Sequence, residues 1–250
     1  MDGGRVRYAE RGEGDSVVLL IHGFGGDLDN WLFNLDALAE KHRVLVVDLP
    51  GHGQSGKTIP DPSLQGMASF VGSFLNTVEV ETVHAVGHSM GGAIAMQLAL
   101  DRPDLVRSLT LICSAGLGSE VNGTYLKGYV ESQSRRELKP VLQYLFADES
   151  LVTRQLVDDV LKYKRLDGVD EALRALHKTL FGSMPEDLAN RTSASGKSVL
   201  VICGAKDRVI PAANAHIVSG ASVEIFDTAG HMVQMEKASD VNRKLLEFLS

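Results

Sequence analysis

A serine stands between two glycines in the segment GHSMG at residues 87–91. A hydroxyl on such a turn can attack a carbonyl carbon when a nearby base removes its proton. The pattern is short enough to arise by chance, so its surroundings must agree with it. The apolar run Val83–Val86 precedes it and helical spacing over Gly91–Leu100 follows it. This context predicts a nucleophile elbow, with strained backbone at Ser89 and glycines where side chains would collide with backbone.

Two further residues have the types and positions that a serine nucleophile requires. Asp207 follows the apolar run Val199–Cys203, and His231 follows the next run, Val223–Phe226. We expect His231 to take the Ser89 proton and later return it to the leaving group. Asp207 would hold the imidazole tautomer and stabilise the imidazolium.

A glycine-rich loop, HGFGG at residues 22–26, follows the apolar run Val17–Ile21. Glycines let backbone approach a bound substrate closely. We expect the backbone N–H groups of Phe24 and Met90 to point at one carbonyl oxygen and form an oxyanion hole. Losing one such donor typically costs about 3–4 kcal/mol of transition-state stabilisation.

Several side chains near these loops are candidate substrate contacts. For His22 we favour a hydrogen-bonding role that shapes the loop, and for His88 a packing role beside the nucleophile. For the aromatic members, ordinary core packing is the favoured interpretation over a pocket wall. The candidates are His22, His88, Trp31, Tyr125, Tyr129 and Met232.

Other titratable residues suggest no further chemistry. Asp227 is a rival acid, but it stands so close to His231 that a turn position is favoured. The four histidines 42, 84, 177 and 216 lack metal-ligand spacing, and no phosphate-binding glycine loop is present. Cys113 and Cys203 lie in apolar runs and are expected to be buried. We therefore expect no metal site and no required cofactor.

The elements that position these residues alternate along the chain. Short runs of Val, Ile and Leu without polar alternation are typical of a parallel sheet covered on both faces. With helical segments between them, they predict an open α/β sheet. The expected strands are Val17–Ile21, Val44–Leu49, Val83–Val86, Leu109–Cys113, Val199–Cys203 and Val223–Phe226. The expected helices are Trp31–Lys41, Gln65–Asn76, Gly91–Leu100 and Ala238–Leu249.

The stretch 116–191 breaks this alternation. It shows helical spacing over Glu137–Phe146, Ser150–Tyr163 and Val169–Leu180, without a convincing strand. We expect a helical cap insertion at 116–191 over the carboxyl edge of the sheet, where ligands of open α/β sheets bind. Residues 1–115 and 192–250 would form the core.

Composition excludes several classes of protein. The 250 residues are 44% hydrophobic and 23% charged, which is ordinary for a globular chain. The formal net charge of −7 disfavours a nucleic-acid binder. The polar start holds no apolar signal core, and the apolar runs are too short to span a membrane. We expect a cytoplasmic protein with a small-molecule substrate and no nucleic-acid or membrane partner.

The ordered motifs HGFGG, DLPGHGQS, GHSMGG, GAKDRVIP and GHMVQME resemble the α/β-hydrolase superfamily across essentially the whole chain. The resemblance implies an α/β-hydrolase fold, with a mostly parallel sheet, helices on both faces and an inserted cap. Haloalkane dehalogenases and epoxide hydrolases carry aspartate where this chain has Ser89. Hydrolases of ring-cleavage products often carry tryptophan where this chain has Met232. The family's nucleophile, acid, base and oxyanion positions fall on Ser89, Asp207, His231, Phe24 and Met90.

The cap segments SRRELKPVLQYLFAD and VTRQLVDDVLKYKRLDGVDEALRAL, with GHMVQMEKASDVNR, give a narrower resemblance. They are similar to the hydrolase-like domain of the dihydrolipoamide acetyltransferase component of acetoin dehydrogenase complexes. This implies a lipoyl or coenzyme A thioester as substrate and association with a dehydrogenase complex. Such components normally begin with a lipoyl domain, so we expect a free-standing relative or a piece of a longer protein. Conventional lipoyl acyltransferases carry a histidine where this chain has Tyr163, so acyl transfer here must use Ser89.

We therefore expect a serine-nucleophile enzyme that forms an acyl-enzyme from an ester or thioester and passes the acyl group to water or a thiol. Alternatives are a carbon–carbon bond hydrolase, a lyase or a haloperoxidase on the same fold, or a non-catalytic assembly module. A set of basic residues in the cap could contact coenzyme A phosphates, although a solvated helix face is the favoured interpretation. This set is Arg135, Arg136, Lys162, Lys164 and Arg165.

Overall fold

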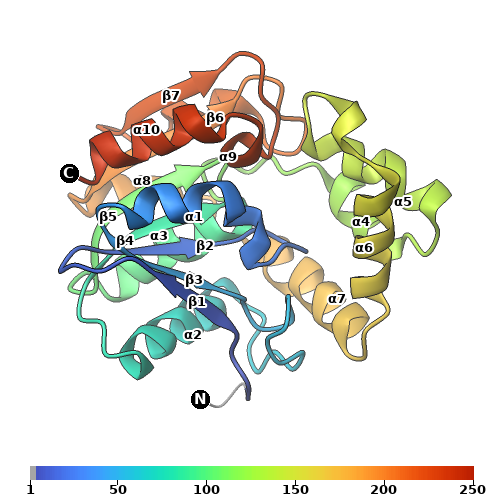
Figure 1. The fold of residues 1–250 in the computed structure, drawn as a ribbon, viewed down its shortest axis with the longest axis horizontal. Helices are drawn as coiled ribbons and strands as arrows, with labels where there is room; N and C mark the ends of the chain where they lie inside the picture. Colours follow the sequence, from blue (N-terminus) through green and yellow to red (C-terminus); the bar gives the residue numbers. More distant parts are fainter. Residues whose placement is uncertain (1–3) are drawn as a thin grey trace.

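Seven strands form one sheet in the order β1-β3-β2-β4-β5-β6-β7 (Figure 1), in a computed structural model that describes residues 4–250. Neighbouring strands are parallel, except that β1 pairs antiparallel with β3. This confirms the mostly parallel sheet that the apolar runs predicted. The strands are β1 Tyr8–Arg11, β2 Val17–Ile21, β3 Arg43–Val47, β4 Val83–His88, β5 Val106–Ile112, β6 Ser198–Gly204 and β7 Ser222–Phe226.

Strand β1 was not predicted from the sequence. Its four residues, YAER, are largely exposed and form no apolar run. It pairs with the outer edge of the sheet, where Tyr8 lies opposite Val47 and its ring contacts Phe74 edge-on at 5.4 Å. An edge strand needs little apolar surface, and charged side chains on it discourage pairing with another chain.

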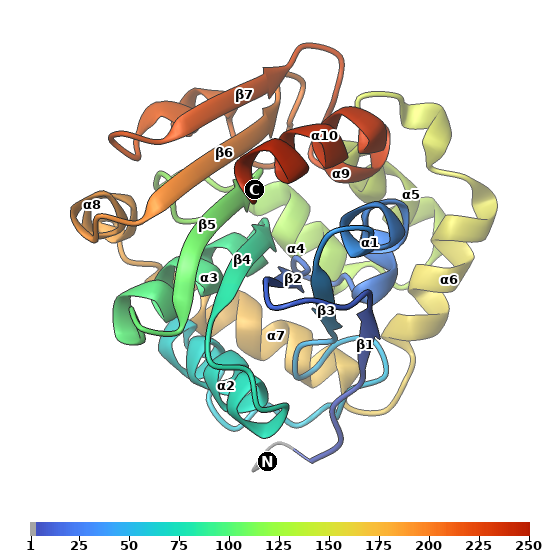
Figure 2. The same cartoon turned by 60° about the vertical axis from the view of Figure 1, so that its left-hand side comes forward.

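Helices cover both faces of the sheet, with α1, α9 and α10 on one face and α2, α3 and α8 on the other (Figure 2). Strand β2 shows why its run is wholly apolar. Leu19 and Ile21 join the core on one face, whereas Val18 and Leu20 join the core on the other. The helices are α1 Leu32–Ala39, α2 Leu64–Thr77, α3 Met90–Asp101, α8 Leu188–Ala194, α9 Val233–Glu236 and α10 Ala238–Phe248.

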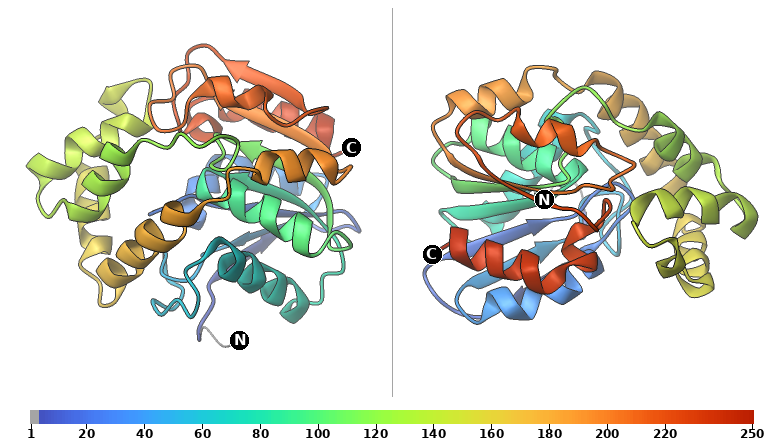
Figure 3. Two further views of the ribbon diagram at one scale, coloured as in Figure 1. Left: turned by 180° about the vertical axis from the view of Figure 1, so that it is seen from behind. Right: turned by 90° about the horizontal axis from the view of Figure 1, so that it is seen from above.

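Between β5 and β6 the described chain forms only helices and loops. The helices α4, α5, α6 and α7 gather beyond one end of the sheet, as Figure 1 and the right panel of Figure 3 show. Short 3-10 turns at 143–145 and 149–151 interrupt two of the helical segments expected from the sequence. The bounds are α4 Gly123–Glu131, α5 Arg135–Leu142, α6 Arg154–Lys164 and α7 Val169–Thr179.

The expected end of the cap, residue 191, falls inside α8. This helix packs against α3, and its Leu188 and Ala189 belong to the main core cluster. A boundary within a packed helix would split one layer of the core. We therefore propose that the insertion ends before Leu188.

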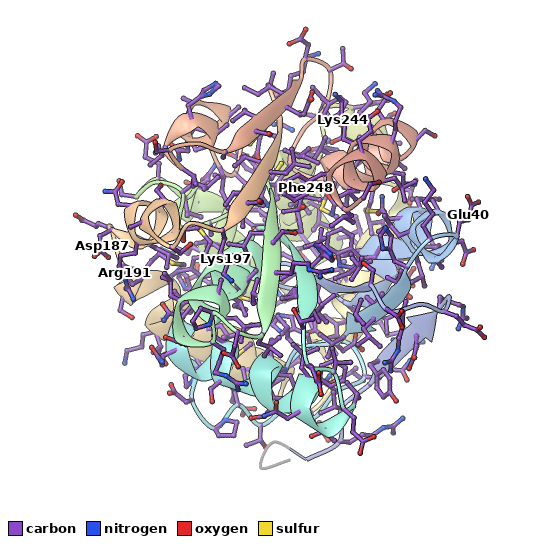
Figure 4. All side chains as sticks on the ribbon, turned by 90° about the vertical axis from the view of Figure 1, so that its left-hand side faces the viewer. Glu40, Asp187, Arg191, Lys197, Lys244 and Phe248 are labelled. Atoms are coloured by element: carbon purple, nitrogen blue, oxygen red, sulfur yellow. The ribbon has the colours of Figure 1, made fainter. Side chains whose placement is uncertain are left out.

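The end of the sheet opposite the cap carries charged side chains that tie neighbouring elements together (Figure 4). Lys244 of α10 pairs with Glu224 of β7 at 2.5 Å, and Lys197 donates to the Pro103 carbonyl at 2.6 Å. Over the described residues, none of the helices is long and apolar enough to cross a membrane.

Candidate active site

Ser89 sits at the junction of β4 and α3 with φ 54° and ψ −118°, a backbone region that non-glycine residues rarely adopt. Two glycines are required around it. A Cβ on Gly87 would lie 2.3 Å from the Gly91 carbonyl oxygen, and a Cβ on Gly91 would lie 2.3 Å from the Ile21 carbonyl oxygen. The Ser89 N–H donates to the Ile112 carbonyl at 2.9 Å. The expected strained elbow and its glycine collisions are confirmed.

His231 and Asp207 meet behind the elbow. The protonated Nδ1 of His231 donates to Oδ2 of Asp207 at 2.8 Å, and their side chains are only 2% and 1% exposed. The other carboxylate oxygen accepts the N–H groups of Val209 at 2.7 Å and Ile210 at 3.0 Å. Burial acts to raise the pKa of Asp207, but the imidazole and these hydrogen bonds outweigh it and lower the pKa. The carboxylate is thus held ionised. The rival Asp227 is exposed.

Ser89 and His231 line the same cavity of about 490 Å³. Among residues 4–250, Ser89 forms no side-chain hydrogen bond with His231 in this structure. Such contacts are often long before substrate binds and tighten in the complex. Ser89 and His231 therefore share one cavity, although their side chains are not hydrogen-bonded to each other.

The cavity lies between the carboxyl ends of the strands and the cap, and its walls are mostly apolar. The cap contributes Tyr125 and Tyr129 from α4, Leu142 from α5, and Phe146 after it. Glu236 is the one acidic side chain among the described lining residues, and no lysine or arginine lines the cavity there. Such walls favour an apolar, uncharged ligand.

Two neutral histidines hold the loop at residues 23–26. Nε2 of His22 accepts the Leu49 N–H at 3.0 Å, and Nε2 of His52 accepts the Gly25 N–H at 3.1 Å. Each Nδ1 then carries the proton and donates to a nearby backbone carbonyl. Burial lowers the pKa of both rings, which keeps them neutral. His22 therefore shapes the loop, as favoured from the sequence, and does not line the cavity.

The two amides expected to form an oxyanion hole belong to the segments that meet at Ser89. Met90 is the first residue of α3, where N–H groups have no partner within the helix. Gly23 passes so close that a Cβ on it would lie 3.0 Å from the Ser89 Cβ. Within residues 4–250, the N–H groups of Phe24 and Met90 donate no hydrogen bond to the chain. They are free to act as donors, and that role remains a proposal.

The other candidate substrate contacts divide into two groups. His88, Tyr125, Tyr129 and Met232 line the cavity. Trp31 does not, and its assignment as a substrate contact is corrected here. Its side chain is fully buried in the core cluster on the α1 and α10 face of the sheet. Sequence spacing could not show to which side of its helical turn the indole would point.

The basic residues of the cap do not reach the cavity. Lys164, expected on a solvated face, is buried and donates to the carbonyls of Val130 at 3.2 Å and Ser132 at 2.7 Å, at the end of α4. Burial lowers its pKa to about 8. Arg135 pairs with Asp158 on the surface. Arg136, Lys162 and Arg165 are exposed, as expected.

Cys113 is a neighbour of Asp207 and His231 that the sequence did not reveal. Its sulfur lies within 4.8 Å of ligand atoms of Asp207 and His231. These are residue types that bind zinc, but the Asp207 and His231 atoms are already hydrogen-bonded to each other. Burial also raises the pKa of the Cys113 thiol, which keeps it protonated. The cluster therefore fits packing behind the site better than a metal centre.

The comparisons with known proteins agree with the fold described above. Residues 16–238 match the family described as alpha/beta hydrolase fold. A relative from Cupriavidus necator, named as the dihydrolipoyllysine-residue acetyltransferase component of an acetoin cleaving system, is 54% identical, and the match covers 100% of this chain and 67% of that relative. A Paraburkholderia phymatum relative, named 2-hydroxy-6-oxononadienedioate/2-hydroxy-6-oxononatrienedioate hydrolase, is 30% identical, and the match covers 98% of this chain and 91% of that relative.

The solved structure of a meta-cleavage product hydrolase from Pseudomonas fluorescens IP01 has a TM-score of 0.87 at 24% identity, covering 97% of this chain and 93% of that chain. This likeness shows the fold. Together with the sequence matches, it confirms both the expected fold and the resemblance read from the motifs.

The pH dependence of stability follows from His88, whose Nε2–H donates to the His231 carbonyl at 2.9 Å. Burial, with His231 nearby, lowers its pKa from 6.5 to about 3. As pH falls below 6.5, the His88 imidazole becomes protonated in the unfolded chain but stays neutral in the folded protein. The free energy of unfolding therefore decreases. Between pH 7 and pH 5 this contributes about 2 kcal/mol. In His88→Gln, the decrease in unfolding free energy between pH 7 and pH 5 should be smaller than in the wild type by about 2 kcal/mol. Urea unfolding at the two pH values measures this difference.

The exposed His216→Gln is the matched control for this prediction, because that side chain is solvated in the folded protein. Comparing each protein with itself at two pH values cancels any packing loss common to both. An unchanged difference between pH 7 and pH 5 in His88→Gln would contradict the assignment of a buried neutral imidazole.

Proposed function

This chain belongs to the α/β-hydrolase fold family, and we propose that it is a serine-nucleophile enzyme of acyl transfer acting on an ester or thioester. The observation that carries the proposal is the shared cavity of Ser89 and His231. Ser89 stands on a strained turn and lines the cavity, and His231 is hydrogen-bonded to the ionised Asp207. A nucleophile, a base and an orienting acid is the set that acyl transfer by serine requires.

In the proposed reaction, the Ser89 Oγ attacks the carbonyl carbon and its proton passes to Nε2 of His231. The carbonyl oxygen becomes an oxyanion that accepts the N–H groups of Phe24 and Met90. The imidazolium is stabilised by Asp207 through Nδ1. When the tetrahedral intermediate collapses, His231 protonates the leaving alcohol or thiol, and an acyl ester of Ser89 remains.

The acyl-enzyme then passes its acyl group to water or to a thiol, with His231 as base again. We propose a thiol as acceptor, supported by the acetyltransferase name of the relative at 54% identity. By this proposal a lipoyl or coenzyme A thioester is a substrate, and each step uses only the chain's own groups, so no resident cofactor is required. The acetoin cleaving system named for that relative supports association with a dehydrogenase complex.

A carbon–carbon bond hydrolase is the second candidate, supported by the relative at 30% identity. The substrate in that relative's name carries two carboxylates. The apolar walls here, with Glu236 as their acidic group, give such anions no cationic partner among the described lining residues. An uncharged acyl group is therefore the better match. A non-catalytic assembly module on this fold would not form the covalent Ser89 adduct tested next. A lyase or a haloperoxidase that uses the same three groups would form it, and is distinguished by a lack of turnover of esters and thioesters.

Ser89→Ala is expected to lower kcat on short-chain esters and thioesters by about 10⁴-fold, because no other group can form the acyl-enzyme. A fluorophosphonate probe should label the folded protein at Ser89, as located by mass spectrometry of the digested protein. Ser239→Ala, an exposed serine on α10, is the matched control and should label normally. Full activity in Ser89→Ala would remove Ser89 as the nucleophile, and a folded wild type that the probe does not label would remove the enzyme assignment.

The acceptor is tested by product partition. With S-acetyl-dihydrolipoamide, a thioester, as donor and coenzyme A as second thiol, we expect the yield of acetyl-coenzyme A to exceed that of free acetate and to saturate with coenzyme A concentration. Saturation indicates a bound thiol rather than chance capture of the acyl-enzyme. If acetate dominates at saturating thiol, the chain is a hydrolase of the same serine chemistry.

The preference for an uncharged acyl group predicts a difference between two matched esters. An ester whose acyl chain ends in a carboxylate should have a kcat/KM about 100-fold below that of its methyl-ended equivalent, because the carboxylate loses its hydration in an apolar cavity. Phe33→Arg, at a half-exposed position in the cavity lining, should narrow this ratio. Ile217→Arg, exposed but outside the cavity lining, should leave it unchanged. Equal rates for both esters in the wild type would contradict the preference.

A further inference from the structure

The backbone around His231 is held by hydrogen bonds from outside its own loop. The His231 carbonyl accepts Nε2–H of His88 at 2.9 Å. The next N–H, that of Met232, donates to the Leu145 carbonyl of the cap at 3.0 Å. The orientation of the proposed base therefore depends on groups beyond Asp207.

The peptide before His231 is held by a carboxylate. The Gly230 N–H donates to Oε1 of Glu236 at 2.8 Å. The other oxygen, Oε2, accepts the Ala147 N–H at 2.9 Å. Ala147 follows the cap residue Phe146, which lines the cavity. One side chain thus joins the segment that carries the base to the segment that closes the cavity.

The segments around Gly230 and Ala147 are packed so closely that a side chain at position 230 would collide with the cap backbone. A Cβ on Gly230 would lie 2.6 Å from the Ala147 nitrogen and 2.8 Å from the Phe146 carbonyl carbon. No side chain can stand between them at this point. The Glu236 carboxylate accepts hydrogen bonds from the N–H groups of both segments, those of Gly230 and Ala147.

A carboxylate suits this place for a chemical reason. It has two oxygens that only accept hydrogen bonds, and here both face N–H donors. A glutamine of the same shape has one such oxygen, and its NH₂ group would turn a donor toward one of the two N–H groups. The ionised acid therefore fits where its neutral isostere cannot.

We propose that Glu236 is a positioning residue that fixes the His231 backbone through Gly230 and couples it to the cap through Ala147. This rests on the proposed function, in which His231 is the base. Glu236 acts through the backbone and does not touch the reacting atoms. A small displacement of the imidazole from the Ser89 hydroxyl is then sufficient to slow proton transfer, because catalysis depends steeply on geometry.

Kinetics of Glu236→Gln test the proposal on a neutral ester. We expect kcat to fall by about 10- to 100-fold while KM stays within about twofold. Fluorophosphonate labelling of Ser89 should slow by a similar factor. Amide hydrogen exchange at Gly230 and Ala147 should become faster. Glu247→Gln, an exposed carboxylate on α10 that pairs with Arg243, is the matched control and should change none of these.

Glu236→Asp separates positioning from general stability. Its carboxylate is shorter by one methylene group and cannot span both donors, so kcat should fall although the charge is kept. If Glu236→Gln fails to fold, this variant carries the test alone. A folded variant of either kind with wild-type kcat, or one whose loss lies in KM rather than kcat, overturns the proposal. A wild type that is not labelled at Ser89 would instead overturn the proposed function, and the exchange rates would still report on the Glu236 contacts.

Discussion

The site depends on the close passage of three backbone segments around Ser89. The turn after β4 is squeezed between the end of β2 and the start of α3, and only glycine fits at positions 87 and 91. This contact holds Ser89 in a left-handed backbone conformation that an isolated chain would avoid. The strain is offset by the packing of the sheet, so the placement of Ser89 at the cavity wall is a product of the whole fold.

Around this turn, protonation states are set mainly by burial. His22, His52 and His88 are kept neutral because each is removed from water. His22 and His52 hold backbone groups through both ring nitrogens, and His88 does so through Nε2. Asp207 is buried as well, yet it stays ionised because one imidazole and two backbone amides donate to it. The same low-dielectric surroundings therefore hold three neutral histidines and one ionised carboxylate, and the hydrogen bonds to Asp207 make the difference.

The cap does more than cover the cavity. Tyr129 donates to the Gly25 carbonyl at 2.9 Å, so α4 is tied to the loop of the proposed oxyanion hole. Leu145 and Ala147 bond to the segment that carries His231. Lys164 in turn holds the end of α4, which bears Tyr129. The cap and the loops that carry Gly25 and His231 thus share hydrogen bonds, so a displacement of one would move the other.

The sequence by itself determined the parallel sheet, the elbow, and the acid and histidine that end neighbouring strands, because buried strands and tight glycine turns leave local patterns. It did not predict β1, whose edge position needs no apolar run, nor the burial of Lys164, which depends on what packs against it. The motif GHMVQME contains Glu236, but the sequence did not indicate which groups its carboxylate would bind. Only the tertiary structure brought Ala147 and Gly230 to that carboxylate and Cys113 to Asp207, because these contacts join residues far apart in the chain and no local pattern records them.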